Sequence, residues 1–408
     1  MDNDRRKFLH YAAAITGVSV LAACGDKPAN NAGPANTAAP DEPEPTPEIV
    51  DTPGKRGMLI GPGSASGETK CWLTFIALDH VEEYATGKRK VDRLPIAFPG
   101  HAVVPHPTQP HLAAVFQKWG PGACEVDLVE RKVTRPITTV PERMFYGHGA
   151  WSSDGKLLYA VESTDPKLGP YEGSVVVRDA GNLRIMAEFP TYGMQPHDCH
   201  LLDDGRTLGI TNGGGPPGGN EPGCVTFVDI QTQALLEKVT IPELMAGHLM
   251  TSGRSSKGDL AVGCTPHSPP GTGPEGFKTV PGGLALRAAG SKDLKLMRQP
   301  ATVTGKMLGE TLSLAIHERR GIAGATNPAG NIATFWKVAT GELIKSFELP
   351  VARGIGLTLD NTHFLVSYGM DASLVMIRAS DLELVPATRL TGDNKSYVTG
   401  SHFITYDL

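Results

Sequence analysis

A unit of about fifty residues recurs along most of this chain, and it constrains the fold more than any other feature. In its clearest copy a Gly-His pair at Gly147 opens an apolar strand, Asp154-Gly155 makes a turn, and a second strand follows. Further strands are expected from Gly173 to Ala180 and from Arg184 to Phe189. Asp-Gly dipeptides favour hairpin turns because they accept positive φ. Units of this length with four strands each are typical of a β-propeller.

Counting such units predicts an all-β, seven-bladed β-propeller, and a pair of β-sandwiches is the alternative. The predicted blades cover residues 58–97, 98–142, 143–193, 194–244, 245–307, 308–350 and 351–408. The segment 401–406 is expected to pair with the first blade and to close the ring. The 48 glycines and 33 prolines, with little helical periodicity, fit many short strands joined by turns.

Residues 1–24 resemble a twin-arginine export signal that ends in a lipobox. The pair Arg5-Arg6 is followed by Phe and Leu at the positions that this signal requires, and a 13-residue uncharged run covers 11–23. Such a run is too short to span a bilayer but suits a signal peptide. Cys24 follows Leu-Ala-Ala and is the expected lipidation site, with an ordinary cleaved signal as the alternative. We therefore predict export of a folded protein to the periplasmic side of the cell envelope, where a lipid anchors it to the membrane.

Residues 25–57 differ in composition from the rest and are rich in Pro, Ala, Asn, Asp and Glu. A segment with so little apolar surface cannot offset its conformational entropy, so we predict a disordered linker between the anchor and the propeller domain at 58–408.

Net charge and cysteine spacing exclude several classes of protein. The net charge of −5 and the absence of a basic stripe argue against nucleic acid as a partner. No Cys-x-x-Cys pair occurs, which excludes zinc ribbons and thioredoxin-type motifs. An odd number of cysteines in the domain leaves at least one thiol over, and buried free thiols are expected at Cys71, Cys124, Cys199, Cys224 and Cys264.

Four histidines repeat in register with the blades. His101, His148, His197 and His248 lie 47, 49 and 51 residues apart, and three of them directly follow Gly. Each stands near the start of the first strand of its unit, which is the innermost strand of a blade. We expect the four imidazoles to converge at one mouth of the central channel, where they would suit a transition-metal ion such as iron, copper or zinc. The alternatives are a structural histidine repeated in each blade and a site for an anionic ligand.

Further candidates lie near these histidines. Additional metal ligands are predicted at Asp198, Glu162 and His402. His200 is ranked low because strand alternation places it on the opposite face from His197. Arg143 and Tyr146 flank the second histidine and are candidates for binding an anionic ligand or cofactor; a surface Arg and a packed Tyr are the alternative.

The stretches 145–149 with 151–159, and 196–198 with 201–208, resemble the DUF1513 family over most of the domain. The resemblance implies a bacterial propeller of unknown activity exported by the twin-arginine route. It also implies a context of periplasmic iron uptake and haem-peroxidase partners. This family often has Pro-His-Glu where Pro-His-Asp198 stands here. The resemblance therefore implies a carboxylate ligand at this position, with its oxygen atoms shifted because the Asp side chain is shorter than Glu.

Three functions remain open. The first is a monomeric, metal-binding accessory protein for iron or copper handling or electron transfer, with periplasmic iron-uptake or redox proteins as partners. The second is a lactonase-type hydrolase with a metal-activated water, for which only Glu162 and Asp198 offer acidic ligands. No Gly-x-Ser-x-Gly or His-Glu-x-x-His motif is present. The third is a WD40-like interaction scaffold. We expect an accessory protein rather than a stand-alone enzyme.

Overall fold

The computed structural model describes residues 49–65, 70–165, 172–215, 221–241 and 243–408. The predicted export signal with Arg5 and Arg6, the lipobox with Cys24, and most of the predicted linker lie outside these residues. None of the helices in the described part of the chain is long and apolar enough to cross a bilayer.

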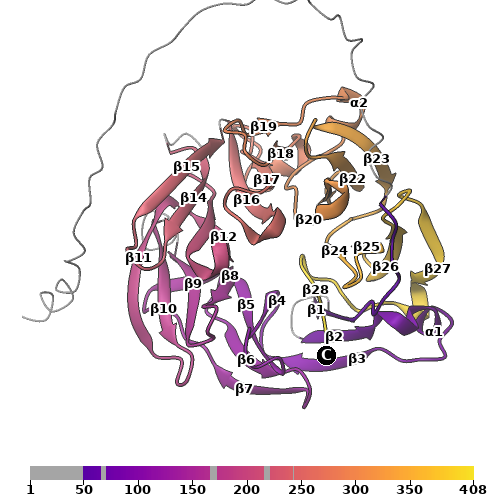
Figure 1. Ribbon diagram of the computed structural model, residues 1–408, viewed down its shortest axis with the longest axis horizontal. Helices are drawn as coiled ribbons and strands as arrows, with labels where there is room; N and C mark the ends of the chain where they lie inside the picture. Colours follow the sequence, from indigo (N-terminus) through magenta and orange to yellow (C-terminus); the bar gives the residue numbers. More distant parts are fainter. Residues whose placement is uncertain (1–48, 66–69, 166–171, 216–220, 242) are drawn as a thin grey trace, which may run out of the picture. The chain divides into compact units, whose positions relative to one another are not determined.

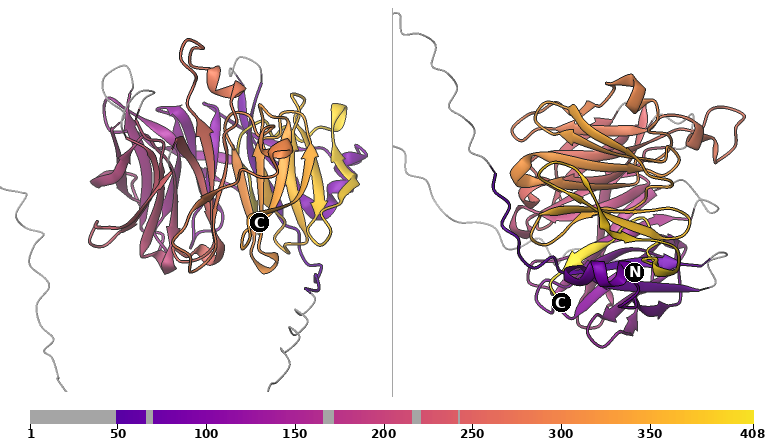
Figure 2. Two further views of the ribbon diagram at one scale, coloured as in Figure 1. Left: turned by 90° about the horizontal axis from the view of Figure 1, so that it is seen from above. Right: turned by 90° about the vertical axis from the view of Figure 1, so that its right-hand side faces the viewer.

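The described residues form an all-β propeller, as the repeat predicts (Figure 1). Sheets stand side by side around a central axis, and their strands run roughly along that axis when the ring is viewed edge-on (Figure 2). Four of the sheets are antiparallel meanders of consecutive strands. Their strands are β12 (Pro196–Leu202), β13 (Thr207–Asn212), β14 (Gly223–Asp229) and β15 (Leu235–Ile241); β16 (Leu244–Thr251), β17 (Leu260–Pro266), β18 (Gly283–Arg287) and β19 (Lys295–Leu296); β20 (Ser313–His317), β21 (Ile322–Asn327), β22 (Ile332–Lys337) and β23 (Glu342–Glu348); and β24 (Ile355–Leu357), β25 (His363–Tyr368), β26 (Ser373–Arg378) and β27 (Leu384–Leu390).

An eight-stranded sheet contains two further four-stranded meanders. They are β4 (Gly100–Pro105), β5 (Leu112–Gly120), β6 (Ala123–Asp127) and β7 (Lys132–Pro136), and β8 (Arg143–Trp151), β9 (Leu157–Thr164), β10 (Glu172–Asp179) and β11 (Ile185–Met194). The two meanders join where the end of β5 pairs with β8, Lys118 with Tyr146 and Gly120 with Phe145. The predicted count of seven blades stays a prediction.

The remaining sheet closes the ring. It contains β1 (Met58–Ser64), β2 (Cys71–Ala77) and β3 (Asp92–Ile96), and β28 (Ile404–Tyr406) pairs antiparallel with β1. Figure 1 shows β28 beside β1, as the predicted pairing of segment 401–406 requires. Helices are short and lie outside the central strands: α1 (Val81–Ala85), α2 (Ala301–Thr304) and the 3₁₀ turns Leu78–His80, Asp203–Gly205, Ser252–Arg254, Gly276–Thr279, Glu318–Arg320 and Gly392–Asn394.

The core lies between neighbouring sheets rather than at the centre of the ring. The rings of Phe335 and Phe364, from adjacent sheets, pack edge to face with centroids 5.0 Å apart, and both are fully buried. Burying one such side chain contributes about 1.5–3 kcal/mol. The five cysteines of the described residues are also buried, and none forms a disulfide. The apolar faces of the sheets pack against one another, and the innermost strand of each sheet lines the central channel.

Residues 49–57, which the sequence places in the linker, contact the propeller. The Arg320 guanidinium donates to the Asp51 carboxylate at 2.6 Å. The backbone N–H of Arg56 donates to Asp79, and that of Gly54 donates to Asp360. The compact unit accordingly begins at Ile49, before the predicted boundary at Met58.

Candidate metal centre

The structure brings the four repeated histidines together. His101, His148, His197 and His248 come from β4, β8, β12 and β16, and each offers a ring nitrogen within 4.8 Å of those of the others. None is more than 8% exposed. They are therefore buried inside the channel and not exposed at its mouth, where the sequence places them.

A bulge accompanies each of these histidines. The ladder between the innermost strand and its neighbour shifts register between Gly100 and Ala102, and between Ala246 and His248. Similar shifts occur around His148 in β8 and around His197 in β12. A bulge breaks strand alternation and re-aims a side chain. All four imidazoles thereby turn out of the regular strand pattern at the same level of the channel.

Gly147 shows why a glycine precedes a histidine here. Its φ is +113°, and a Cβ at this position would lie 2.3 Å from Cδ2 of His101. Only glycine tolerates both the backbone conformation and this close approach. The backbone before His148 therefore packs directly against the His101 imidazole.

His402 joins the group from the segment that precedes β28. Its ring centroid lies 4.3 Å from that of His248 and 4.6 Å from that of His101. The hydroxyl of Ser313 in β20 is 3.3 Å from His402 Nδ1. A Cβ on Gly356 in β24 would lie 2.8 Å from the Phe403 ring. Small residues in β20 and β24 thus leave room for the closing segment to bring in a fifth imidazole.

We call His101, His148, His197, His248 and His402 the histidine group. All five have an Nε2 atom that is buried and lacks a hydrogen-bond partner among the described residues. Leaving a buried polar atom unpartnered costs about 1–3 kcal/mol. Five such atoms in one group are the donor set that a transition-metal ion prefers. The group could hold a metal ion.

Asp198 connects the group to His200. Its Oδ1 lies 3.0 Å from Nδ1 of His148, and its Oδ2 lies 3.2 Å from Nε2 of His200 and 3.7 Å from Nδ1 of His248. The backbone N–H of Leu249 also donates to Oδ2. A carboxylate on Nδ1 fixes the imidazole and directs Nε2 toward a metal. His200, ranked low from strand alternation, therefore contacts the site through Asp198 on the same bulged strand.

Two residues of the site were not predicted. Oε1 of Glu310 lies 3.6 Å from Nε2 of His248 and 3.3 Å from Nζ of Lys118. Lys118 lies near the end of β5, where that strand extends to pair with β8. The two residues are 192 positions apart, and neither belongs to a repeated motif. No signal in the sequence alone connects them with the histidines.

Tyr146 borders the group, whereas Arg143 and Glu162 do not join it. The Tyr146 ring packs edge to face on His197, with centroids 4.9 Å apart. Arg143 donates to Glu188 at 2.6 Å. Glu162 is fully buried, where it forms an ion pair with Arg178 and accepts from the backbone N–H of Val140. Its carboxylate is thus satisfied by a guanidinium, which explains its burial without a metal.

Burial keeps most of the group neutral. It lowers the pKa values well below the ordinary value for three imidazoles, those of His101, His197 and His402. Burial alone would also lower the pKa of His248, but the nearby carboxylates of Asp198 and Glu310 raise it. Neutral imidazole is the form that binds a metal ion. The group is therefore prepared for a cation at neutral pH.

Both carboxylates beside the group stay ionised. Burial would raise the pKa of Asp198, but its close contacts with the His148 and His200 imidazoles hold it well below its ordinary value. For Glu310, burial is outweighed by Lys118 and His248, and its pKa is lowered to about 2. The charge of Glu310 is paired with Lys118, so Asp198 supplies the negative charge that attracts a cation to the group.

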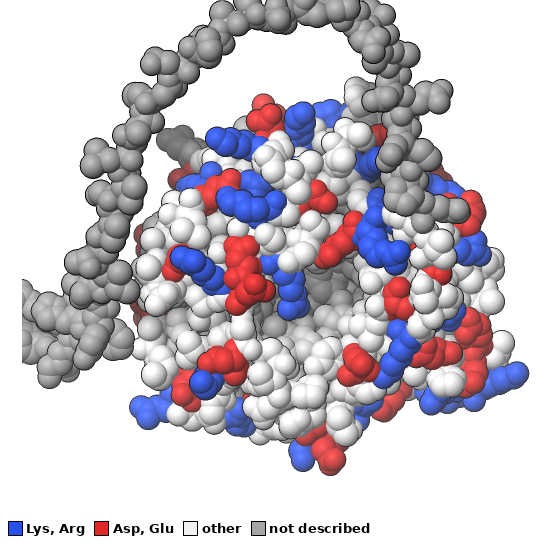
Figure 3. Space-filling view, in the orientation of Figure 1, with Lys and Arg blue, Asp and Glu red and all other residues white. Residues whose placement is uncertain are grey.

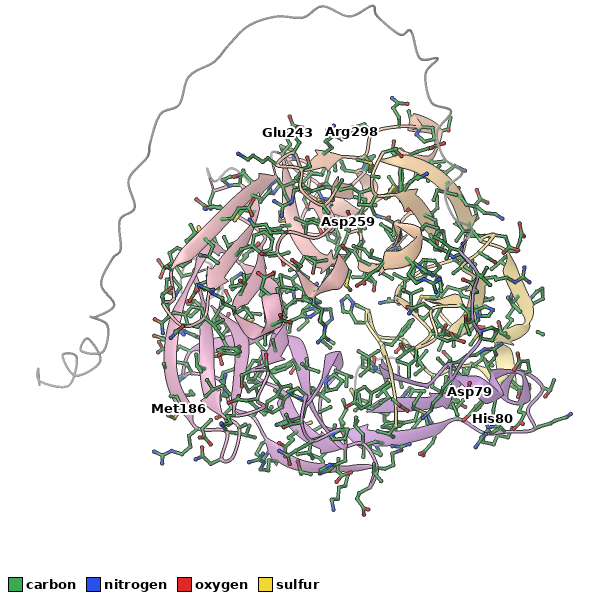
Figure 4. The ribbon with its side chains drawn as sticks, viewed as in Figure 1. Asp79, His80, Met186, Glu243, Asp259 and Arg298 are labelled. Carbon is green, nitrogen blue, oxygen red and sulfur yellow. The ribbon has the colours of Figure 1, made fainter. Side chains whose placement is uncertain are left out.

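One side of the group borders a cavity of about 680 Å³ along the innermost strands. Its lining includes His148, Asp198, His200, His248 and His402, but not Lys118 or Glu310. In Figure 3 the face seen along the ring axis is hollowed at its centre, and both positive and negative side chains surround the hollow. Figure 4 shows side chains with nitrogen atoms reaching into the central space, whereas the labelled Met186 and Glu243 lie on the outer rim.

These features define a class: a β-propeller with a buried histidine group in its central channel. The family model "Protein of unknown function (DUF1513)" matches residues 94–396, more than half of the chain. The chain belongs to this family, which confirms the resemblance seen in the sequence. A search of curated proteins finds no match.

Among solved structures, the chain is similar to Kuenenia stuttgartiensis hydrazine synthase. The TM-score is 0.57 at 15% identity, and the match covers 82% of this chain and 98% of the other. A likeness at this level of identity shows the fold alone.

Proposed function

We propose that this protein binds one of the transition metals iron, copper or zinc at the histidine group, as a lipid-anchored accessory protein on the periplasmic side of the cell envelope. The observation that carries the proposal is the set of five buried, unpartnered Nε2 atoms in one group. Export through Arg5 and Arg6 and lipidation at Cys24 complete the proposal, as the resemblance of residues 1–24 to such signals supports.

Each residue of the group has a definite part in this proposal. His101, His148, His197 and His248 are the primary ligands, because their ring nitrogens lie mutually close. His402 is a further ligand. Asp198 orients His148 through Nδ1. Bound iron or copper would supply one-electron chemistry, and bound zinc would act as a Lewis acid.

The accessory role is iron or copper handling or electron transfer, and the family context favours periplasmic iron-uptake or redox proteins as partners of a monomer. We also propose seven blades, because the eight-stranded sheet reads as two four-stranded meanders linked through only a short β5–β8 pairing. The signal proposed covers residues 1–24, and the linker proposed begins at residue 25 and leads into the compact unit that starts at Ile49.

A lactonase-type hydrolase is the second candidate. Two ionised carboxylates, Asp198 and Glu310, lie beside the group, and the cavity gives a substrate access to it. Hydrolysis of lactones by zinc-loaded protein, abolished in Asp198→Asn, would favour this candidate over the accessory role.

The first test is metal content, measured by mass spectrometry on protein exported through its own signal. We expect stoichiometric iron, copper or zinc, and its loss from the His148→Ala/His197→Ala variant. The matched control replaces two exposed histidines, His80→Ala/His111→Ala, and should keep its metal. Circular dichroism checks that each variant is folded. A protein that holds no metal and takes none up in any form contradicts the proposal and leaves an interaction scaffold as the better reading.

A further inference from the structure

We propose that the metal ion of the histidine group keeps an open coordination position toward the cavity. This position would take a neutral small molecule that has one metal-coordinating atom and an apolar body. The inference rests on the proposed metal site and adds the class of ligand that reaches it.

The group is enclosed unequally on its two sides. His148, His248 and His402 line the cavity, whereas His101 and His197 do not. On the enclosed side, Tyr146 packs against His197, and the ion pair of Lys118 and Glu310 contacts His248. Structural metal sites are closed by protein ligands, whereas sites that act on a ligand keep a position open. The cavity provides the space for such a position.

The cavity has polar ends and an apolar wall. Its floor is formed by His148, His248 and His402 with Asp198 and His200. Its mouth includes three exposed residues in the turns after β8, β12 and β16: Ser153, Asp204 and Arg254. Its wall between these ends includes Ala102, Val103, Leu249, Leu314, Ile316 and Ile355. A volume of about 680 Å³ lies in the usual range for a small-molecule pocket.

This arrangement selects against charged ligands. Moving a charged group along the apolar part of the wall carries a desolvation cost. An anion would also approach the carboxylate oxygens of Asp198, which line the floor. An apolar body gains about 25 cal/mol for each Å² that it buries. A neutral molecule with one nitrogen, oxygen or sulfur donor therefore fits the wall and the floor together.

The test uses full-length protein loaded with cobalt(II), whose visible absorption reports its coordination. Mass spectrometry first establishes that cobalt is bound; failure to load would count against the metal site itself. Loaded protein is then titrated with imidazole and with 4-phenylimidazole. We expect both to change the cobalt spectrum, with 4-phenylimidazole binding at least about tenfold more tightly because its phenyl ring is buried against the wall. Cobalt in buffer gives the reference ratio.

Two variants locate the binding path. Ser153→Trp, at the exposed mouth, should slow association several-fold, whereas Ser291→Trp, an exposed residue outside the lining, should not. Met250→Gln keeps the length of a wall side chain but makes it polar, and it should reduce the preference for 4-phenylimidazole. Loaded protein whose spectrum ignores both ligands, or which binds them with the ratio seen in buffer, overturns the inference while leaving the metal site intact.

Discussion

The innermost strands of this propeller fall into two regions. β4, β8, β12 and β16 each contribute a histidine at a bulge. In the other region, Ser313 of β20 contacts His402, and Gly356 of β24 packs against Phe403. A structural histidine belonging to the repeat would occur in both regions. The histidines therefore serve a local site, and the small residues of the second region leave room for His402.

The largest effect is expected from removing one imidazole of the first region. His248→Ala should weaken metal binding by more than about 100-fold, since losing even a supporting residue costs about 10–100-fold. The matched control is His317→Ala, a buried histidine of β20 whose Nε2 lies 3.0 Å from the Asn361 carbonyl oxygen. Metal affinity by chelator competition should fall only in the first variant. If both variants lost metal affinity equally, the two regions would not differ in their contribution to metal binding.

Asp198→Asn tests the carboxylate of the first region. The amide keeps the shape of the side chain but removes the charge that faces His148, His200 and His248, so metal affinity should fall about 10–100-fold. Asp360→Asn serves as control, because Asp360 accepts hydrogen bonds from Thr358 and Thr362 beside β24. Chelator competition on both variants makes the comparison; an unchanged affinity in Asp198→Asn would remove the carboxylate from the site.

The pH dependence of binding distinguishes His248 from the other members of the group. Burial lowers the pKa values of His101, His197 and His402, whereas Asp198 and Glu310 overcome burial and raise that of His248. Because its pKa is raised, His248 is the first member of the group to be protonated as the pH falls, and a metal must displace that proton. Below the raised pKa of His248, affinity should fall about tenfold for each pH unit, the slope for one proton. Titrations between about pH 7.5 and 6 measure it; a slope of three or four protons contradicts the assignment.

The smallest effect is expected in the second region. Ser313→Ala removes the hydroxyl that contacts His402 and accepts from the backbone N–H of Ile355, which should cost about 1 kcal/mol of stability. Metal affinity should change only several-fold, because His402 keeps its place before β28. Denaturant unfolding and chelator competition check the two quantities. A loss of affinity as large as that of Asp198→Asn would make the second region an equal contributor.

Much of this organisation was readable from the sequence, because blade spacing is a property of the sequence itself. The spacing predicted the propeller and the ring closure, and it selected the four histidines that meet. What it could not show was pairing between strands. The bulge in β12 alters the alternation that ranked His200 low, and β-bulges are defined only by the partner strand.

Contacts between residues that are separated in the sequence account for the remaining differences between the predicted and the observed site residues. Glu162 was a candidate ligand because it is acidic and follows a blade strand, but Arg178 on the neighbouring β10 neutralises it. Lys118 and Glu310 meet only because β5 extends beyond its blade to pair with β8. Nothing local marks either residue, so only the assembled ring identifies them.

The position of His402 makes the site dependent on a completed ring. It directly precedes β28, which is attached to β1 through only three residue pairs. A chain that ends before residue 402 keeps four imidazoles but loses both the fifth and the strand that seals the ring. A ligand that prefers the complete group stabilises the sealed state over any opened one by mass action. Metal binding would then stabilise the closed ring at the point where the two ends of the domain pair. The fraction of protein that holds metal would measure how much of it has a closed ring.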